Sequence, residues 1–417
     1  MSGFKGIGPA AIDLPLAKLT VVVGENGVGK SSLWQALALT AQSATEQLAL
    51  YDIVLAGSKW RYPGRIDEIY HRHDPSKPLS VGIDMSASLA GAESIVSYTW
   101  TRVAKEEQRA FKHEFSVNGA PIWTVGWLDL AQAFGERRFE ANNRGERVSA
   151  TTPFSFDRVL DEQMLHRREL AGVQHSKNVD DLVQTLRPIF AAYKEQFRKT
   201  GYLEALRGKA LVALEPGDSN TVGPHGEQLV RVLNNIQARE RRKDFSLVRK
   251  WAENYGLPHL DSGMQTGGLL STSAADPQTE TSVRIHDFAD GAFQGLLLAA
   301  QLFLSEPGTL VMIDEPESNL HPRFEKLMAE MLVEAANNNK QLLVSTHSEV
   351  LVAALSGLVR SGKIGPQNVA IHELARTDQG LVLRQLDMSS RGLTEWVKSF
   401  SAVDDDLNAE WIDGLPE

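Results

Sequence analysis

The chain has 417 residues, of which 42% are apolar and 23% are charged, as is usual for a globular protein. Lys and Arg total 43 against 53 Asp and Glu, and the net charge of -10 argues against a protein that coats nucleic acid over its whole surface. The lack of cysteine excludes disulfides, thiolate metal sites and cysteine nucleophiles. No apolar run reaches the roughly 20 residues that cross a bilayer, and no signal-peptide pattern is visible, so we expect no membrane segment and a cytoplasmic protein.

The N-terminal part predicts a strand, a glycine-rich turn and a helix, followed by an antiparallel sheet. The strand is the β-branched run Lys18–Val23, and the helix begins at Ser31. Between Leu79 and Val125, short alternating runs are separated by turn signals such as Asn118-Gly119. Residues 127–260 predict mostly helices, among them Asp157–Leu170, Val179–Phe197 and Val230–Tyr255, and the Gly-, Ser- and Thr-rich residues 261–281 predict a mobile loop.

Towards the C-terminus, strands and helices alternate, which predicts a mostly parallel sheet. The predicted helices are Phe288–Phe303, His321–Ala336 and Glu349–Arg360. The predicted strands are Thr309–Ile313, Gln341–Ser345, Val369–Glu373 and Leu381–Gln385.

The turn after the first strand matches G-x-x-x-x-G-K-[ST] at every fixed position. Its residues are Gly24, Glu25, Asn26, Gly27, Val28, Gly29, Lys30 and Ser31, followed by Ser32. Glycines let backbone N–H groups turn towards phosphate, and the helix N-terminus also favours an anion. Lys30 would contact the β- and γ-phosphates, and the hydroxyl of Ser31 would bind Mg²⁺. The alternative is a turn that only links strand to helix, but the strand before it and the helix after it favour nucleotide binding.

Two further strands end in polar residues that could complete such a site. The apolar run 310–313 leads into Asp314 and Glu315, which would hold Mg²⁺ and orient the attacking water. The run 342–345 leads into His347, which could contact the γ-phosphate. Taken alone, the acids could be a solvated turn, and the His could be a surface residue beside a helix capped by Ser348. The order of the three motifs favours the functional interpretation.

Together these motifs resemble an ABC-type ATPase head, and more closely the stand-alone ATPases of the OLD and RecF-like group. The acidic motif of that group runs into Pro-Glu and Leu-His-Pro, as residues 313–322 do here, and its histidine motif is S-T-H-S, as at 345–348. The resemblance covers residues 1–60 and about 225–375. It implies an α/β P-loop NTPase fold with an antiparallel β lobe and a helical insertion, and a short β-hairpin over Phe4–Val23.

The resemblance also implies roles for individual residues. Lys30, Glu315 and His347 would be catalytic, with Glu315 activating water and His347 sensing the γ-phosphate. Asp314 and Ser31 would hold Mg²⁺, and Ser318–Leu320 would face a second copy of the chain. The signature loop that completes the partner's site matches Phe288–Gly291, so Asp290 and Gly291 would contact ATP. The family usually has Ser where this chain has Ala289, which removes one hydroxyl donor to the γ-phosphate.

These assignments predict three parts of the chain. Residues 1–126 would form the N-terminal part of the ATPase head with the β lobe, 127–225 a helical insertion, and 226–417 the rest of the head. Several OLD-type proteins carry a Toprim nuclease, but residues 348–417 offer no spaced acid set for its metals, so we expect none in this chain. The acidic run Asp404–Asp406 would be a solvated tail.

A basic stretch keeps nucleic acid among the expected partners. Residues 104–260 carry 24 Lys and Arg against 21 Asp and Glu, densest over 239–250. A helix presenting Arg239, Arg242, Lys243 and Lys250 could follow a phosphate backbone, so the insertion at 137–250 is a candidate DNA-binding segment. The alternative is a solvated helix with pairs to Glu240 and Asp244.

The sequence thus predicts Mg²⁺-dependent ATP hydrolysis by a homodimer or higher homo-oligomer. The leading hypothesis for its role is the sensor or motor subunit of an antiphage defence module with a separately encoded effector, a nuclease or a toxin. A RecF-like DNA-repair ATPase that clamps DNA, and an ATP-binding scaffold that sequesters a toxin, stay open as alternatives. A transporter subunit is disfavoured by the signature loop and the large insertion.

Overall fold

The computed structural model describes residues 1–401 except 46–52, 54, 58–59, 90, 106–107, 131–136, 144–145, 153–187, 190, 206–213, 218, 220, 239–241, 266 and 378–379. Its contacts divide the chain into two units. The first contains Met1–Asp13, Ser32–Arg198 and Thr377–Leu381, and the second contains Leu14–Ser31, Lys199–Arg376 and Val382–Glu417. The phosphate loop, the acidic strand end and His347 all belong to the second unit.

The second unit is built on a mostly parallel sheet, as the sequence predicts. The strand order is β15-β14-β1-β13-β12-β8. The bounds are β1 (Leu19–Val23), β8 (Gly201–Leu203), β12 (Leu310–Asp314), β13 (Gln341–Thr346), β14 (Val369–Thr377) and β15 (Gly380–Leu386). Parallel pairs join β1 to β13 and β14, and β12 to β13 and β8. Every residue of β1 and β12 is buried, as apolar strands covered on both faces require.

The register of this sheet brings three strand ends to one edge. Val23 pairs with Thr346, and Asp314 pairs with Ser345. The carboxyl ends of parallel strands share an edge, where ligands bind in open α/β sheets. The residues that follow β1, β12 and β13 therefore meet there.

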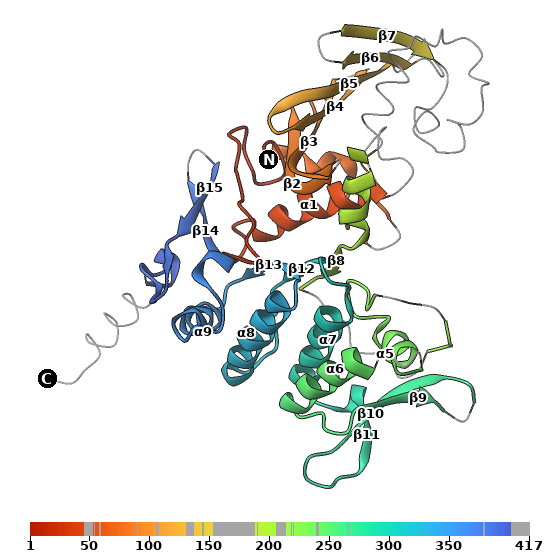
Figure 1. Ribbon diagram of the computed structural model, residues 1–417, viewed down its shortest axis with the longest axis vertical. Helices are drawn as coiled ribbons and strands as arrows, with labels where there is room; N and C mark the ends of the chain where they lie inside the picture. Colours follow the sequence, from red (N-terminus) through yellow and green to blue (C-terminus); the bar gives the residue numbers. More distant parts are fainter. Residues whose placement is uncertain are drawn as a thin grey trace, which may run out of the picture. The chain divides into compact units, whose positions relative to one another are not determined.

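Three helices lie side by side next to β12 and β13 (Figure 1). They are α7 (Asp290–Leu304), α8 (Pro322–Asn337) and α9 (Glu349–Arg360). In α7 every residue from Ala292 to Leu304 is buried, which is expected of a helix covered all round. Pro322 occupies the first turn of α8, and the Ser348 hydroxyl accepts from Leu351 N (2.9 Å) to cap α9. Both helix starts are confirmed.

The helical segment predicted over 230–255 contains two helices, α5 (Leu229–Ala238) and α6 (Arg242–Asn254). Aromatic side chains anchor α6 and the residue after it. Trp251 stacks on Phe303 of α7 at 6.5 Å, and Tyr255 stacks on Phe324 of α8 at 5.3 Å between ring centroids. These contacts make α5 to α8 one packed group of helices within the second unit.

Residues 261–281 are not the loop that their composition predicts. They contain β9 (Asp261–Met264) and β10 (Leu270–Ala275), which pair antiparallel with each other, and β10 also pairs with β11 (Ser282–Arg284). Four residues of β10 that include Ser271 and Thr272 are buried, and the Ser262 and Thr272 hydroxyls lie 3.0 Å apart. The hydroxyls satisfy one another, so a strand forms without the apolar alternation that would have indicated it.

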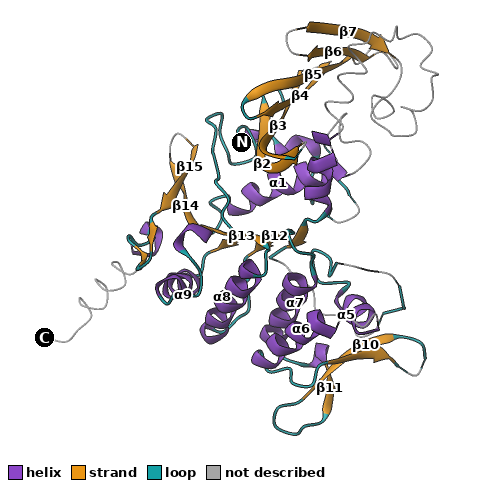
Figure 2. Ribbon diagram, in the orientation of Figure 1, coloured by secondary structure: helices purple, strands orange, loops and turns teal. Residues whose placement is uncertain are grey.

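The first unit contains a six-stranded antiparallel sheet in sequence order, shown by the orange arrows β2 to β7 in Figure 2. Its strands are β2 (Leu79–Leu89), β3 (Ala92–Lys105), β4 (Gln108–Val117), β5 (Ala120–Leu130), β6 (Arg137–Asn143) and β7 (Glu146–Thr152). The predicted β lobe and the turn at Asn118-Gly119 are confirmed. The helical prediction is wrong over β6 and β7, because pairing of β6 with both β5 and β7 outweighs local propensity.

Of the remaining sequence predictions, one is wrong and the others are not tested by the described residues. No β-hairpin forms over residues 4–23, all of which are described. Instead, Ser2 and Phe4 make isolated antiparallel bridges to Ser80 and Tyr70 before the chain enters β1. Strand β5 crosses residue 126, and the domain boundaries at 126/127 and 225/226 stay predictions. The predicted helix Asp157–Leu170, the start of Val179–Phe197 and the tail Asp404–Asp406 lie outside the described residues.

The remaining elements of the described residues are helical segments and one pair of very short strands. Helix α1 spans Lys30–Thr45, and residues 191–198 are helical. Short 3-10 helices are η1 (Ile66–Ile69), η2 (His71–His73), η3 (Ile285–Asp287) and η4 (Pro366–Asn368), and β16 (Met388–Ser389) pairs with β17 (Gly392–Leu393).

We expect Gly295→Ala to destabilise the second unit, although alanine favours helices. A Cβ at Gly295 in α7 would lie 2.2 Å from the Tyr255 ring, so the ring must move away from Phe324. Overpacking of this kind costs about 1–3 kcal/mol, against a propensity gain of about 1 kcal/mol. The matched control is Gly357→Ala in α9, where the nearest atom is 3.9 Å away and only the gain applies. In urea unfolding, we expect the free energy of unfolding to fall for Gly295→Ala and to rise for Gly357→Ala. A rise for both variants would contradict this packing.

Candidate functional site

The phosphate loop connects β1 to α1 through three glycines in the left-handed region. Gly24, Gly27 and Gly29 have φ values of 156°, 74° and 114°. Gly24 also lies against β14, because a Cβ there would stand 2.5 Å from the Leu374 carbonyl oxygen. The backbone therefore takes a path that other residues disfavour, as a loop that turns its N–H groups towards an anion requires.

Lys30 begins α1 and folds back over this loop. Its Nζ donates to the carbonyl oxygens of Gly24 (2.8 Å) and Glu25 (3.0 Å), and the residue is 5% exposed. Burial lowers the pKa of Lys30, while the carboxylates of Glu315, Asp314 and Glu317 oppose that shift. The ammonium thus stands between the phosphate loop and the acidic strand end, and phosphate oxygens would replace its backbone acceptors.

Asp314 joins the phosphate loop to the neighbouring strands. Its Oδ2 accepts from the Ser31 hydroxyl (2.8 Å), and its Oδ1 accepts from the Ser345 hydroxyl at the end of β13. Asp314 is 6% exposed. A carboxylate and a hydroxyl oxygen at this separation are hard ligands of the kind that Mg²⁺ takes alongside water and phosphate. The chemistry of the pair therefore fits the ion, and its assignment as the metal site stays a prediction.

Glu315 and His347 follow β12 and β13 and face each other. His347 Nδ1 lies 3.7 Å from Glu315 Oε1, and both side chains are partly open to solvent. Glu315 has a φ of 43°, a conformation uncommon for a residue with a side chain, and its N–H donates to the Ser345 carbonyl (2.8 Å). The two residues assigned to water activation and γ-phosphate contact are thus neighbours at the same sheet edge as Lys30 and Asp314.

Glu317 contacts both the backbone and the ring of His347, and the sequence prediction missed it. Its Oε1 accepts from Thr346 Oγ1 (2.6 Å) and from the backbone N–H of His347 (2.8 Å), and it lies 3.2 Å from His347 Nδ1. Burial raises the pKa of Glu317, and the donated hydrogen bonds oppose that shift. No local pattern distinguishes Glu317, since its contacts depend on β12 and β13 being neighbours.

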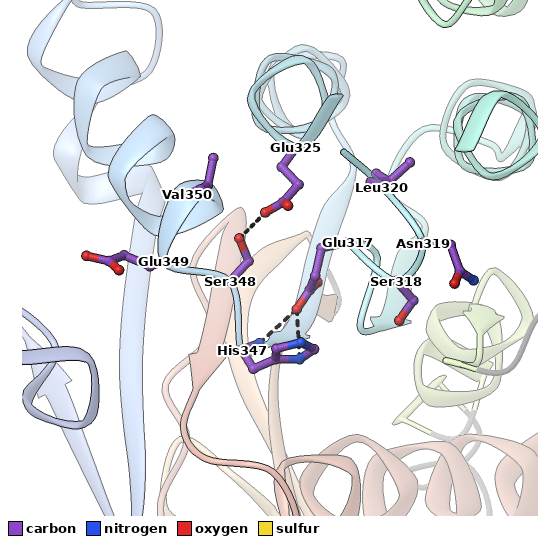
Figure 3. Close-up of a pocket in the computed structure, with 9 residues that line it drawn as sticks. All are labelled: Glu317, Ser318, Asn319, Leu320, Glu325, His347, Ser348, Glu349 and Val350. Carbon is purple, nitrogen blue, oxygen red and sulfur yellow. Dashed lines mark hydrogen bonds and ion pairs between the residues drawn. The ribbon is translucent and has the colours of Figure 1, made fainter. Parts of the chain in front are cut away.

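A pocket of about 480 Å³ lies beside this cluster (Figure 3). It is lined by residues of the turn after β12, of the first turn of α8, of the loop after β13 and of the start of α9: Glu317, Ser318, Asn319, Leu320, Glu325, His347, Ser348, Glu349 and Val350. The Glu325 carboxylate accepts from Ser348, the capping residue of α9. The predicted dimer-facing residues 318–320 therefore line the pocket together with His347.

The candidate signature loop precedes α7. Ala289 is the N-cap of α7 and supplies no side-chain hydrogen bond, so the hydroxyl expected from the family is missing at a helix start. A Cβ at Gly291 would lie 3.4 Å from the Asn319 carbonyl oxygen and 3.5 Å from Leu320. The loop thus lies next to residues 318–320, which are predicted to face a second copy of the chain.

The basic helix is partly neutralised by its own unit. Lys250 Nζ lies 2.8 Å from Glu334 of α8, and Arg249 donates to the Leu260 carbonyl (2.9 Å) and stacks on Phe245. The side chains of Arg239, Arg242 and Lys243 lie outside the described residues. Lys250 therefore pairs with a residue of a neighbouring helix, and the predicted pairs within the helix to Glu240 and Asp244 involve side chains outside the described residues.

Two features are absent from the part of the chain that the structure describes. None of the described helices is both long and apolar enough to span a bilayer. Within the same part of the chain, no three His, Asp or Glu side chains gather as a protein-only metal cage. A metal at Asp314 and Ser31 would therefore need water or phosphate oxygens to complete its ligands.

We expect Gly24→Ala to abolish nucleotide binding and Gly27→Ala to preserve most of it. Both glycines have positive φ, so alanine costs about 1 kcal/mol or more of backbone strain at each. Only at Gly24 does the new Cβ meet backbone, whereas nothing lies within 4 Å at Gly27. Titration with a fluorescent ATP analogue measures the difference. Equal affinities of the two variants would contradict the geometry of the loop.

The glycine-rich loop after the buried strand β1, and the acidic end of β12 on the other side of β13, define a P-loop NTPase. The chain belongs to the family described as "AAA domain, putative AbiEii toxin, Type IV TA system", which matches residues 19–353. It is also 21% identical over 362 residues to "Old nuclease" of Escherichia phage P2, and the matched region covers 81% of this chain and 54% of the relative. The chain therefore spans about half the length of that relative. The predicted resemblance to OLD-type ABC ATPases is confirmed at the level of family.

Solved structures of SMC heads are also similar. An SMC head bound to the C-winged helix domain of ScpA is 13% identical, with a TM-score of 0.44 and coverage of 93% of this chain and 96% of that one. An SMC head with an extended coiled coil, bound to the C-terminal domain of ScpA derived from Pyrococcus furiosus, is 13% identical, with a TM-score of 0.42 and coverage of 98% of both chains. The SMC head domain from Thermotoga maritima is 12% identical with a TM-score of 0.37, covering 93% of this chain and 97% of that one.

Proposed function

We propose that the chain hydrolyses ATP to ADP and phosphate in the presence of Mg²⁺, as an ABC-type ATPase that works as a dimer. The observation that carries the proposal is the pairing of Ser31 with Asp314 at the sheet edge that also holds Lys30 and Glu315. Phosphoryl transfer depends mainly on positioning and on stabilising charge, and these residues supply both.

Each residue would have a defined part in the reaction. The phosphate loop and Lys30 would hold the β- and γ-phosphates, and Glu315 would orient the attacking water. Mg²⁺, held by Ser31 and Asp314, would neutralise charge on the phosphate oxygens. His347 would contact the γ-phosphate, so that its loss on hydrolysis changes the surface beside residues 318–320.

A second copy would complete the site. Residues 288–291 and 318–320 lie together, and both belong to segments that face the partner in the family that the sequence resembles. With Ala289 at the helix start, backbone N–H groups and the N-terminus of α7 would meet the γ-phosphate without a side-chain hydroxyl. We therefore expect an ATP-dependent dimer that is weaker than one with Ser at this position.

We assign the chain the role of sensor or motor subunit in an antiphage defence module with a separate effector. The family description names a putative toxin of a type IV TA system, and the phage P2 relative is named as a nuclease. Both names connect proteins similar to this chain with toxin systems or with action on nucleic acid, which supports a role in a module of this kind.

Solution mass with ATP, with ADP and without nucleotide tests the dimer, and co-purification of neighbouring gene products with an ATP-trapped form tests the effector. A mass that doubles only with ATP supports the proposal, and a mass that ignores ATP contradicts the dimer. ATP-dependent DNA binding at low salt, without any effector, would favour the RecF-like alternative.

A further inference from the structure

Glu317 is a buried carboxylate beside the proposed γ-phosphate sensor. The residue is 6% exposed, whereas the side chain of His347 is 42% exposed. Figure 3 shows the Glu317 carboxylate meeting both the backbone N–H and the ring of His347. We propose that Glu317 is a positioning residue that fixes the ring of His347 and keeps a proton on Nδ1. The proposal rests on the function proposed above.

The contacts of Glu317 Oε1 decide which ring nitrogen carries the proton. This oxygen already accepts from Thr346 Oγ1 (2.6 Å) and from His347 N (2.8 Å), so it acts as an acceptor. His347 Nδ1 lies 3.2 Å from the same oxygen. A bare Nδ1 would place two lone pairs against each other, whereas a protonated Nδ1 donates a charge-assisted hydrogen bond.

The second carboxylate oxygen supports this arrangement. Among the described residues, Glu317 Oε2 is buried without a hydrogen-bond partner. A buried carboxylate with one free oxygen is costly unless a positive charge lies beside it. The Nδ1–H of His347 places a partial positive charge beside Oε1, so Glu317 would fix the direction in which the ring faces the proposed γ-phosphate site.

A purely structural role for Glu317 is the alternative, and the turn itself argues against it. Backbone hydrogen bonds from Ser318 N to the Glu315 carbonyl (3.1 Å) and from Leu320 N to the Glu317 carbonyl (2.8 Å) hold the turn. The carboxylate is not part of either bond. Glu317→Gln keeps the size of the side chain and one acceptor oxygen, so we expect the variant to fold.

The kinetic test compares Glu317→Gln with Glu325→Gln. Glu325 is also buried and lines the same pocket, but it bonds to Ser348 instead of His347. We expect Glu317→Gln to lower kcat about 10- to 100-fold, as for other carboxylates that orient a histidine, with little change in KM. Glu325→Gln should keep kcat within about twofold. Equal effects of the two changes would overturn the proposal.

A double variant separates positioning from an independent role. If Glu317 acts through His347, adding Glu317→Gln to His347→Ala should lower kcat no further. Effects that multiply would show that Glu317 acts without His347, and the proposal would fail.

A second readout does not depend on turnover, so it separates this inference from the proposed ATPase activity. Long-range ¹H–¹⁵N spectra of the nucleotide-free chain labelled at histidine nitrogens report the proton on each ring nitrogen, with His347 assigned from His347→Gln. We expect a protonated Nδ1 in the wild type and an altered Nδ1 signal in Glu317→Gln only. A bare Nδ1 in the wild type would refute the inference even if ATP is hydrolysed. If wild type lacks turnover but Nδ1 is protonated, the proposed function fails and the contact stands.

Discussion

Glu315→Gln should abolish turnover while leaving ATP bound. Glu315 follows β12, with its carboxylate 3.7 Å from His347 Nδ1 and close enough to Lys30 to oppose the lowering of the Lys30 pKa by burial. The amide keeps the shape of the side chain but cannot take a proton from water or polarise it. General-base and electrostatic effects of this kind are worth about 10²–10⁴ in rate, so we expect phosphate release to fall by at least about 100-fold.

The same change should trap the ATP-bound dimer. Lys30, Ser31 and Asp314 are untouched, so we expect nucleotide and Mg²⁺ still to bind, and the proposed closed state would not be released by hydrolysis. Solution mass after incubation with Mg-ATP should show more dimer for Glu315→Gln than for wild type. The matched control is Glu349→Gln, an exposed carboxylate at the start of α9 that should retain turnover. Unchanged phosphate release from Glu315→Gln would refute its assignment.

Asp314→Asn should remove the dependence of turnover on Mg²⁺. Asp314 accepts hydrogen bonds from Ser31 and Ser345, and an amide can present only one oxygen to these two hydroxyls and a metal. A Mg²⁺ ion at transferring phosphate is worth several kcal/mol, and each 1.36 kcal/mol is tenfold in rate, so we expect a loss of at least about 100-fold.

The Asp314 prediction is measured by phosphate release across a Mg²⁺ titration. Wild type should respond to magnesium over a saturating range, and Asp314→Asn should stay near background at every concentration. Asp261→Asn removes an exposed carboxylate of β9 and should behave as wild type. Full activity of Asp314→Asn at high Mg²⁺ would mean that another group holds the ion.

The parts of the fold that are marked by local sequence signals, such as helix caps and apolar spacing, could be predicted from the sequence. Helix α9 was predicted with its observed bounds, and α8 within one residue at each end, because caps and apolar spacing agree there. Strands β1, β12 and β13 follow from short apolar runs that end in polar residues. Strands β6, β7 and β9 to β11 were missed because partner strands and hydroxyl pairs stabilise them rather than an apolar pattern.

The residues of the candidate site likewise fall into those that local motifs predict and those that depend on strand pairing. The motifs indicated Lys30, Ser31, Asp314, Glu315 and His347, and the structure brings these residues to one sheet edge. Ser345 and Glu317 could not be predicted, because their contacts join residues about 30 positions apart through the pairing of β12 with β13. A supporting residue is found only when the register between strands is known.

Phosphate release from wild type with ATP, in Mg²⁺ and in EDTA, beside Lys30→Met, tests the central claim most directly. Lys30 is the ammonium over the phosphate loop, and methionine keeps most of the length of the side chain without its charge. The account predicts turnover by wild type in Mg²⁺ only, and background rates for wild type in EDTA and for Lys30→Met in either condition. Wild-type rates no higher than those of Lys30→Met would contradict the assignment of this sheet edge as an ATPase site.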